Sequence, residues 1–435
     1  MALGGGSFIT QNKVIPGAYI NFISKNSSIL SMSDRGVASM ALELDWGVDD
    51  QIFEVTLEDL QKDSLKIFGY EYTSDKLKGL RDLFKSVKKL YCYKLTTGGV
   101  KASNDYATAK YCGTRGNDLK IVIKNNVDQN SHYDVMTYLG SELVDTQTVQ
   151  NRENLVPNDY VEFKTTTLTL QEQTAGVALS NGTNGTVNGA SHQKYLEKIE
   201  SYSFNVIGVL SADDTIKNLY ISFVKRLRDD VGSKFQVVMY NKAADYLGVI
   251  NVKNKVKGDD AASLVYWVTG ITAACPINKS NLNRKYDGEF EVEAEFTQTQ
   301  LEQAILGGEF ALHKVGDDIR VLNDINSFTT ITDDVGDIYK DNQTIRIIDQ
   351  FASEIQKIFI TKYLGIAPND KDTQISFWAD VVKIFQEFRR MRAIEEFNPD
   401  DDIIVNRTGK KTIDVLTALT VIGTVEKLYM TVKVA

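Results

Sequence analysis

The sequence has 435 residues, of which 43% are hydrophobic and 25% are charged, and its formal net charge is −9. This length suffices for about two to four ordinary domains, each with its own core. The acidic balance argues against nucleic acid as the main partner, because phosphate binding needs clustered lysine and arginine, and no apolar run approaches the length of a membrane span.

The amino-terminal region predicts a floppy tail followed by a strand. Residues 1–12 are rich in glycine and polar residues and lack the basic and apolar blocks of a secretory signal. The stretch VIPGAYINFIS (14–24) then alternates as a strand does, with Ala18, Ile20 and Phe22 on one face. Because Pro16 cannot donate to a ladder, the strand should lie at a sheet edge or begin just after the proline.

The next region changes from mixed to β-rich. Over 36–95, GVASMALEL and KKLYCYKL predict strands, with helices around 56–63 and 75–86 between them. From about 100 to 180 the period is two, which predicts a small β-sandwich or barrel. The predicted strands are DLKIVIKNNV, HYDVMTYL, SELVDTQTV, DYVEFK and TTLTLQEQ. The segment SNGTNGTVNGAS (180–191) reads as an exposed loop or linker.

An α/β pattern follows. SFNVIGVL and KFQVVMY are nearly continuous apolar runs, typical of strands buried on both faces. Between them, residues 211–232 predict a helix with acidic residues at its start and Gly232 at its end. A second helix, DDAASLVYWVTGITAAC, should end before Pro276. Strand, helix, strand, helix indicates a partly parallel sheet, which we expect to recruit strands from 36–95, so that the β-rich region is an insertion.

The last hundred residues predict two helices and three strands. The first helix has Asn342 as its cap and stops at Gly365. The second, over 373–396, carries an apolar stripe of Phe377, Val381, Ile384, Phe388 and Met391. The strands are DIIV, KTIDVLTALTV and the terminal VEKLYMTVKVA (425–435), in which one side consists of Leu428, Met430, Val432 and Val434.

The search for catalytic or ligand-binding residues finds none. Three histidines each stand alone, without the spacing of metal ligands, and are interpreted as surface or capping residues: His132, His192 and His313. GVASMA (36–41) is faintly similar to the serine segment of subtilisin-like proteases, but no histidine base accompanies it, so chance similarity in a buried strand is the better account. The glycine-rich stretches lack the lysine of a phosphate loop. We therefore predict no catalytic, cofactor or metal site.

The cysteines indicate the redox environment. They are odd in number and far apart: Cys92, Cys112 and Cys275. This pattern fits buried thiols in a reducing cytosol better than a disulfide framework.

Taken together, the segments resemble contractile tail sheath proteins of myophages and of phage-derived (R-type) bacteriocins, of the type from Gram-positive hosts. The resemblance spans nearly the whole chain, and the order and spacing of its segments carry it. These segments are VIPGAYINF, SDRGVASMALELDWG, AKYCGTRGNDLKIVI, FNVIGVLSADDTIKNLYISFVKRLRDDVGSKFQVVMYN, LVYWVTGITAACPINKSNLNRKYDG, GEFALHKVGDDIRVLNDINSFTT and VEKLYMTVKV.

The resemblance implies a multi-domain α/β and β fold. It comprises a central subtilisin-like domain without catalytic residues, an inserted β-sandwich, and a C-terminal α+β domain with extended terminal strands. The expected divisions are an N-terminal arm (1–25), the first part of the α/β core (26–98), the sandwich (99–190), the subtilisin-like domain (191–328), the C-terminal domain (329–424) and a C-terminal arm (425–435).

The resemblance also implies a function. Hexameric rings would stack helically around a tail tube and contract to drive the tube through the host envelope, without cofactor or fuel. Expected partners are other copies of the chain, the tail tube, and baseplate and tail terminator proteins, with no direct nucleic-acid contact and no membrane insertion. The expected location is the virion tail, assembled in the bacterial cytoplasm; phage and bacteriocin particles are not distinguished.

Two sets of residues carry specific expectations. By the resemblance, each arm completes a sheet in a neighbouring subunit; the residues concerned are Ala18, Tyr19, Ile20 and Phe22 in one arm and Leu428, Met430, Val432 and Val434 in the other. Separately, basic residues near the end of the helix at 373–396 are hypothesised to face acidic groups of the tube: Arg389, Arg390 and Arg392. The sandwich is expected to be a peripheral decoration.

Two alternative functions stay open at this point. One is another viral lattice component, such as a capsid or tail-tube protein, although a tube protein would normally be shorter and mostly β, whereas this sequence has at least four convincing helices. The other is an α/β enzyme of unfamiliar class, which the missing nucleophile, base and metal constellations argue against.

Overall fold

The computed structural model describes residues 5–6, 18–19, 35–171, 173–333 and 335–434. The chain divides into two units, Met1–Asp34 and Arg35–Ala435. In the first unit, β1 (Gly5–Gly6) and β2 (Ala18–Tyr19) pair in parallel. Ile20 and Phe22, with most of the predicted strand at 14–24, lie outside the described residues.

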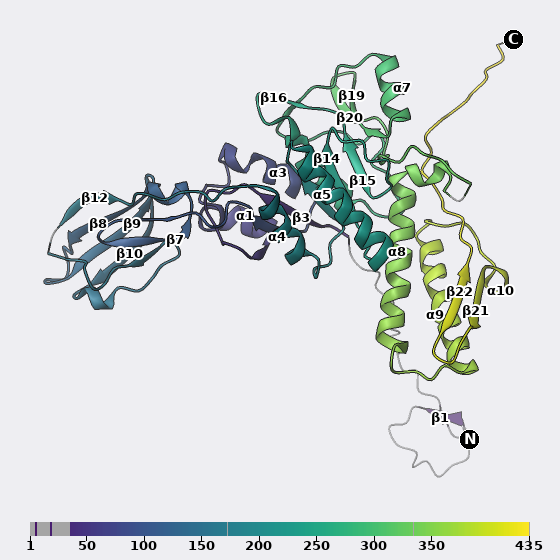
Figure 1. Ribbon diagram of the computed structural model, residues 1–435, viewed down its shortest axis with the longest axis horizontal. Helices are drawn as coiled ribbons and strands as arrows, with labels where there is room; N and C mark the ends of the chain where they lie inside the picture. The colour runs from purple at the N-terminus through teal and green to yellow at the C-terminus, as the bar shows by residue number, and fades with distance from the viewer. Residues whose placement is uncertain (1–4, 7–17, 20–34, 172, 334, 435) are drawn as a thin grey trace. The chain divides into compact units, whose positions relative to one another are not determined.

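A mixed sheet of seven strands organises the described part of the second unit (Figure 1). Its strands are parallel except β4, which is antiparallel to β5. The sheet is continuous across the β-rich region, because Val206 in β13 lies opposite Ala38 in β3. The expected recruitment of strands from 36–95 is therefore confirmed. In sheet order the strands are β18 (Glu309–Phe310), β15 (Val249–Val252), β14 (Gln236–Tyr240), β13 (Val206–Val209), β3 (Val37–Leu42), β5 (Lys89–Lys94) and β4 (Ile52–Thr56).

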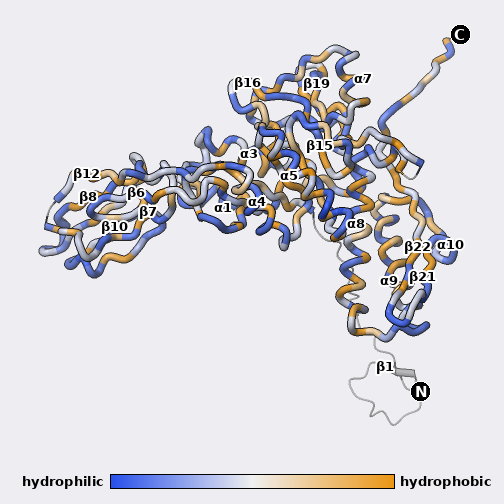
Figure 2. The backbone as a smooth tube through the Cα atoms, in the orientation of Figure 1, coloured by the Kyte–Doolittle hydropathy of each residue, from blue (hydrophilic) through white to orange (hydrophobic). Residues whose placement is uncertain are grey.

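Helices pack on both faces of this sheet, which explains why the apolar strands do not alternate. Every residue of β13 and β15 is buried, as expected for strands covered on two sides, and Figure 2 shows apolar residues at β15. One core joins the sheet to α1 (Leu57–Lys62), α2 (Ser64–Phe68), α3 (Lys78–Phe84) and α6 (Leu264–Ala274). The other joins it to α4 (Gly189–Ile199) and α5 (Asp214–Lys225), which continues as a π-helical turn, Arg226–Val231.

The β-rich region forms a sandwich of two antiparallel sheets, so the predicted β-sandwich is confirmed. The prediction of a strand at TTLTLQEQ is wrong. Residues 165–171 form turns and irregular loop, and the strand that pairs with β8 begins at Thr174. The alternation there arises because Leu168 and Leu170 are buried in the sandwich core from a loop. One sheet contains β10 (Glu142–Val149), β9 (Tyr133–Leu139), β8 (Leu119–Asn125) and β12 (Thr174–Ala178), and the other β11 (Val161–Phe163), β7 (Ala107–Cys112) and β6 (Lys101–Ser103).

The glycine-rich segment 180–191 is exposed, as predicted, but it is not a free linker. Val100 and Thr183 exchange backbone hydrogen bonds of 3.1 and 3.0 Å. Packing is so close here that a Cβ atom on Gly185 would lie 1.8 Å from the carbonyl oxygen of Thr97, so only glycine fits. Helix α4 already begins at Gly189. The chain therefore enters and leaves the sandwich through two bonded, tightly packed connections.

The sandwich core also uses residues from outside the β-rich region. Trp46, which follows β3, is fully buried in this core. Its indole ring packs on Tyr111 and Tyr160, with ring centroids 5.2 and 6.2 Å away, and its Nε1 donates to Lys66 O at 3.0 Å. Leu65 of α2 packs against the same cluster. The sandwich and the α/β domain therefore share a core at their junction.

The remaining elements lie between the sheet and the carboxyl end. Helix α8 is capped by Asp341, whose carboxylate accepts from the backbone of Gln343 and Thr344, rather than by the predicted Asn342. Their bounds are β16 (Val256–Lys257), β17 (Glu291–Val292), α7 (Gln298–Leu306), β19 (Leu312–Val315), β20 (Asp318–Val321), α8 (Asn342–Ile358) with a π-helical turn (Phe359–Tyr363), α9 (Lys371–Arg390), α10 (Pro399–Asp402), β21 (Ile403–Arg407) and β22 (Ile413–Thr417).

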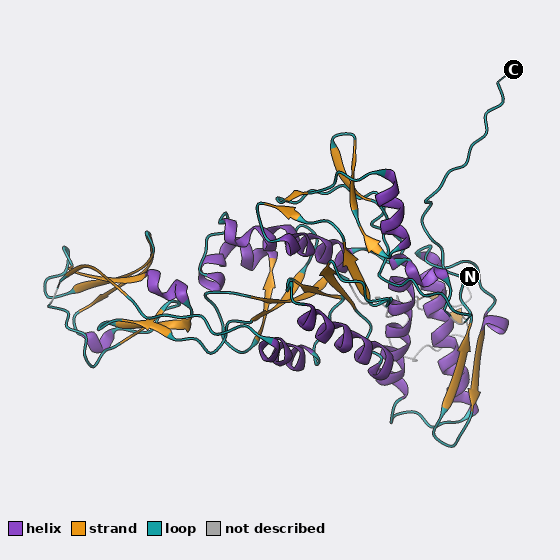
Figure 3. Cartoon of the chain, turned by 45° about the horizontal axis from the view of Figure 1, so that its top comes forward, coloured by secondary structure: helices purple, strands orange, loops and turns teal. Residues whose placement is uncertain are grey.

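Helix α9 is shorter than predicted. It ends at Arg390 rather than 396, because Arg392 adopts φ 58°, which the helix cannot accommodate, and Ala393 N donates back to Phe388 O. Its predicted apolar stripe is buried except at Met391, which is partly exposed. Beside α9, β21 and β22 form a two-stranded antiparallel hairpin (Figure 3).

Candidate functional site at the start of helix α8

The C-terminal arm is an extended chain with an exposed apolar side. Residues 425–434 have no secondary structure and form no hydrogen bond or ion pair with the rest of the described chain. Its four apolar-side residues, Leu428, Met430, Val432 and Val434, are between 67% and 92% exposed. In Figures 1 and 3 no element lies beside the arm, and Figure 2 shows its alternation. A contiguous row of exposed apolar side chains is unusual on a protein surface, which makes the arm a candidate interaction segment.

The arm leaves the body of the protein at helix α8. Thr420 and Ile422 are held by backbone hydrogen bonds of 2.9 Å to Glu395 and Ala393. The side-chain amide of Gln343 then contacts the chain twice: its Nε2 donates to Ile422 O at 3.2 Å, and its Oε1 accepts from Thr424 N at 3.1 Å. These are the last hydrogen bonds before the arm.

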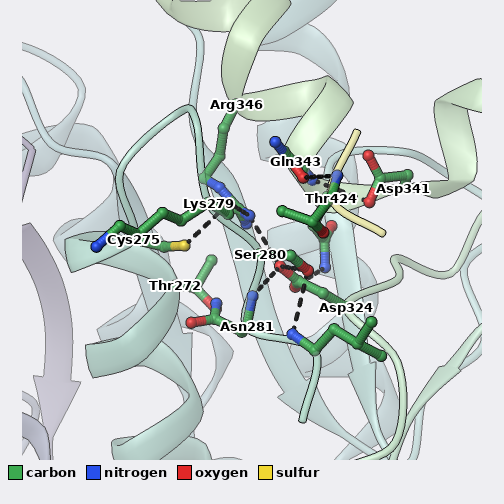
Figure 4. Close-up of polar contacts among 12 residues, drawn as sticks. Thr272, Cys275, Lys279, Ser280, Asn281, Asp324, Asp341, Gln343, Arg346 and Thr424 are labelled. Carbon is green, nitrogen blue, oxygen red and sulfur yellow. Dashed lines mark hydrogen bonds and ion pairs between the residues drawn. The ribbon is translucent and has the colours of Figure 1, made fainter. Parts of the chain in front are cut away.

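Below Gln343, a buried carboxylate fixes the first turn of α8 (Figure 4). Asp324 accepts hydrogen bonds from Arg346 Nη2 at 2.8 Å, Asn281 N at 2.8 Å and Asn342 Nδ2 at 3.1 Å, with Ser280 Oγ at 3.4 Å. The Asp324 and Arg346 side chains are 0% and 1% exposed. Such a pair is costly to break, since either charge alone would be buried without compensation.

The charges of this pair support each other. Burial alone would raise the pKa of the Asp324 carboxyl, but Arg346 and the other donors outweigh burial and hold the pKa below its usual value. Burial likewise opposes the charge of Arg346, and Asp324 raises the pKa of its guanidinium. Arg346 Nε and Nη1 are buried without a partner among the described residues. The pair therefore anchors α8 at the expense of two unsatisfied donors.

Arg35, the first residue of the second unit, contacts the end of α6 close to this buried pair. Its Nε donates to Cys275 O at 2.9 Å and its Nη2 to Thr272 O at 3.2 Å, at the end of α6, where cations are favoured. Burial, followed by the neighbouring Arg346 charge, lowers the pKa of Arg35 to about 10. Arg346 Nη2 also donates to Lys279 O, which Cys275 Sγ contacts at 3.4 Å. The start of the second unit is thus connected, through Cys275 and Lys279, to the network around Arg346.

The hairpin β21–β22 has an open edge. Ala418 N donates to Asp402 O at 3.0 Å, and inter-strand bonds recur at every second residue of an antiparallel ladder. The residues of β22 whose backbone groups face outward are therefore Ile413, Val415 and Thr417, and no described strand pairs with that edge.

The outer edge of β21 is partly blocked. Trp378 Nε1 donates to Ile403 O at 3.0 Å, which occupies the first outward carbonyl of this strand. An additional strand therefore has freer access to β22 than to β21.

The three arginines predicted to face a tube are exposed, but two already have partners. Arg389 pairs with Glu396 and Arg390 with Glu387. The side chain of Arg392 forms no hydrogen bond or ion pair with the described chain. Arg389 and Arg390 are the last two residues of α9, and Arg392 lies just beyond its end, so all three are near the carboxyl end of the helix.

The histidines and cysteines carry no reactive cluster. Within the described ranges, no three His, Cys, Asp or Glu side chains are grouped to hold a metal. His192 is buried, contrary to the surface interpretation: it lies on α4, its Nδ1 is 2.8 Å from Tyr220 OH, and burial lowers its pKa to about 4. All three cysteines are buried and free, as expected. Ser39, of GVASMA, is buried in β3 and bonded to Tyr91 O and Tyr195 OH.

Sequence reasoning missed the residues beneath the arm. Arg346 and Asp349 are charged positions between apolar residues of a helix, and both are buried; charges on an apolar stripe were the available signal. Gln343, Asp324 and Arg35 had no comparable signal, because their partners come from distant segments. Over the described residues, no helix has the length and apolar character needed to cross a membrane.

Comparison with known proteins defines the class. Profiles of phage tail sheath proteins match consecutive stretches: the Gp18 domain III N-terminal region over 35–95, the beta-sandwich domain over 97–184, the central domain over 185–327 and the C-terminal domain over 334–435. Together they account for nearly all of the second unit. The class is therefore that of tail sheath proteins.

Individual relatives agree. The phage-like element PBSX protein XkdK of Bacillus subtilis is 30% identical in an alignment that covers 99% of this chain and 100% of that protein. The solved sheath tail protein of Desulfitobacterium hafniense is 31% identical, with a TM-score of 0.82 over 95% of this chain and 99% of that one. The contracted helical sheath of the anti-feeding prophage shares the fold, with a TM-score of 0.56 and 11% identity. The chain belongs to the phage tail sheath family and is a contractile tail sheath subunit, which confirms the resemblance to the Gram-positive type.

Proposed function

We propose that the subunit polymerises as stacked hexameric rings around a tail tube, and that contraction of the polymer drives the tube through the host envelope. The single observation that carries this proposal is the exposed, unpaired C-terminal arm on a chain of the sheath family. Baseplate and tail terminator proteins would bind the two ends of the polymer, and assembly would take place in the host cytoplasm. The central domain, with its mostly parallel sheet between helices, would have a subtilisin-like topology without catalytic residues.

The C-terminal arm of one copy adds to the open edge of β22 in a second copy. Strand addition satisfies the backbone groups of Ile413, Val415 and Thr417, and it also shields the apolar side of the arm. Main-chain pairing tolerates rotation of the subunit bodies better than a rigid side-chain interface does. The N-terminal arm, through Ala18, Tyr19, Ile20 and Phe22, would likewise complete a sheet in a neighbour. The arms would then hold the lattice together while the subunits move.

The tube would be met by the end of α9. Arg392 is the most available of the three arginines, because its side chain has no partner among the described residues. Exposed ion pairs, of about 0–1 kcal/mol each, are weak enough to be released during contraction. The sandwich, at the far end of two tightly packed connections, would be a peripheral decoration.

Removal of residues 425–435 tests the proposal. The truncated subunit should stay folded, because residues 425–434 form no hydrogen bond with the rest of the described chain, and it should no longer form tubes in electron microscopy. Two matched full-length variants then test whether the apolar side chains of the arm are needed, or only its length. Serine at Leu428, Met430, Val432 and Val434 should abolish tubes, whereas serine at Tyr429, Thr431 and Lys433 should leave most of the polymer. Normal tubes from the truncation would refute the role of the arm.

A further inference from the structure

The segment that leads to the C-terminal arm ends in two hydrogen bonds to the side-chain amide of Gln343, which we call the clasp. Up to Ile422 the chain is held by backbone pairing: Glu395 N donates to Thr420 O, Ile422 N donates to Ala393 O, and Val421 bridges Ile394. After Ile422 backbone pairing stops. The next bonded atom is Thr424 N, and its acceptor is a side chain, Gln343 Oε1.

We propose that Gln343 is a positioning residue that sets the direction in which the C-terminal arm leaves the subunit. Its amide donates to Ile422 O and accepts from Thr424 N, so it contacts residues i and i+2 as a neighbouring strand would. Gln343 itself is 2% exposed. The inference rests on the proposed function of the arm.

The clasp is rigid because of what lies beneath it. Gln343 belongs to the first turn of α8, which Asp341 caps. Asn342, its neighbour, donates to Asp324 Oδ1 and accepts from Gln236 Nε2 at 2.9 Å. One turn later, Arg346 pairs with Asp324 in the buried network (Figure 4). Because the arm is extended over ten residues, a small change in direction at Thr424 displaces its far end by a large distance. A fixed Gln343 amide therefore determines whether the arm reaches the β22 edge of a neighbouring subunit.

The same helix offers a matched control. Gln350 is also buried, at 6% exposed, and its Nε2 donates to Glu354 Oε1 at 2.7 Å within α8, away from the arm. Methionine has a similar length and helix propensity to glutamine but no amide. Gln343→Met and Gln350→Met therefore each remove one buried amide from one helix, and only the first removes contacts with the residues that directly precede the arm.

The test compares these two full-length variants by amide hydrogen exchange and by polymerisation. In the free subunit, Gln343→Met should speed exchange at the Thr424 amide by about fivefold, the loss of one ordinary hydrogen bond, while Gln350→Met leaves it unchanged. Gln343→Met should also yield far fewer tubes than Gln350→Met at equal concentration.

The outcomes separate this inference from the proposal beneath it. If the truncation lacking 425–435 forms normal tubes, the proposed role of the arm fails, and the role of Gln343 fails with it. If the truncation forms none but Gln343→Met polymerises like Gln350→Met, the arm is needed and Gln343 does not position it. If the two variants melt at different temperatures, their polymerisation is compared at a temperature well below both melting temperatures, at which both are folded.

Discussion

Buried ionisable side chains show how individual residues connect separate parts of this subunit. Asp324 and Arg346 lie in different segments, and each would be an uncompensated buried charge without the other. Arg228, in the π-helical turn that follows α5, and Asp349 in α8 form a second such pair at 2.6 Å. Both pairs attach α8 to the α/β domain. Breaking one buried pair by removing a partner costs about 3–5 kcal/mol. The two pairs therefore fix the position of α8 relative to the α/β domain.

A single histidine should give the subunit a measurable pH dependence. Burial lowers the pKa of His192 to about 4 from the usual 6.5, so between these values the unfolded chain binds a proton that the folded chain does not. The free energy of unfolding is therefore unaffected above about 6.5 and should fall by roughly 2–3 kcal/mol as the pH drops toward 4. Urea denaturation at several pH values measures this.

The control for that experiment is a second histidine. His192→Gln should flatten this part of the profile, whereas His132→Gln, on the loop before β9, should leave it as in the parent chain. A profile that is the same with and without His192 would show that the buried imidazole is not the source.

At the scale of elements, the sandwich makes side-chain contacts with the α/β domain at their junction. Trp46 fills the sandwich core from outside, and Lys94, fully buried, donates to Cys112 O at 2.6 Å and pairs with Asp49 at 2.9 Å. These contacts join the last residue of β5 to the end of β7. The sandwich is therefore attached through a shared core and a hydrogen bond from the buried Lys94 to Cys112 O, in addition to its two chain connections.

Deletion of the sandwich should consequently succeed only with a compensating change. Gly185 packs against Thr97, so residues 98–185 can be removed by joining Thr97 to Thr186. The deletion exposes Trp46, and the shortened chain should aggregate. Adding Trp46→Gln should restore a soluble, folded subunit that still forms tubes, as judged by gel filtration, circular dichroism and electron microscopy.

Either of two results would count against this account. Equal solubility of the deletion with and without Trp46→Gln would mean that the shared core is unimportant. A folded double variant that makes no tubes would mean that the sandwich takes part in the lattice.

The sequence predicted elements well where a local pattern determines them. The apolar strands β13 and β14, the helix α5 with its acidic start and its π-helical continuation up to Gly232, and the free buried cysteines follow from periodicity, capping and composition. It failed where tertiary contacts decide. Leu168 and Leu170 alternate as in a strand but enter the core from turns, and Arg392 ends α9 through a left-handed conformation that no local signal announced.

On the scale of the whole subunit, the C-terminal arm lies within the described residues, and most of the predicted N-terminal arm lies outside them. The C-terminal arm is exposed and unpaired from 425 to 434, whereas only Ala18 and Tyr19 of the predicted N-terminal strand are described. The buried network that holds α8 could not be predicted, because Arg35, Asp324 and Arg346 are brought together only by folding. The domain divisions proposed from the sequence stay predictions, alongside the ranges that the family profiles match.

Contact between the sheath and a tube occurs only in the assembled particle, so the predicted role of the three arginines is tested on assembled sheath and tube protein. Glutamate at Arg389, Arg390 and Arg392 should weaken co-sedimentation of the sheath with its tube protein, because acidic groups would then face acidic groups. Glutamine at the same three positions, which removes charge without reversing it, should give an intermediate loss. Sheath tubes formed without tube protein should be unaffected in both. If the glutamate variant binds as the parent does, α9 does not end against the tube.

The burial of every native thiol makes this subunit convenient for site-selective labelling. Since Cys92, Cys112 and Cys275 are all buried, a maleimide dye should not react with the parent protein and should react with a cysteine placed at Tyr429, whose side chain is 89% exposed and lies on the opposite side of the arm from Leu428. No native cysteine would need to be replaced. One fluorophore per chain would then report, by quenching or energy transfer, when the terminal segment docks during polymerisation and whether it stays docked while the polymer shortens.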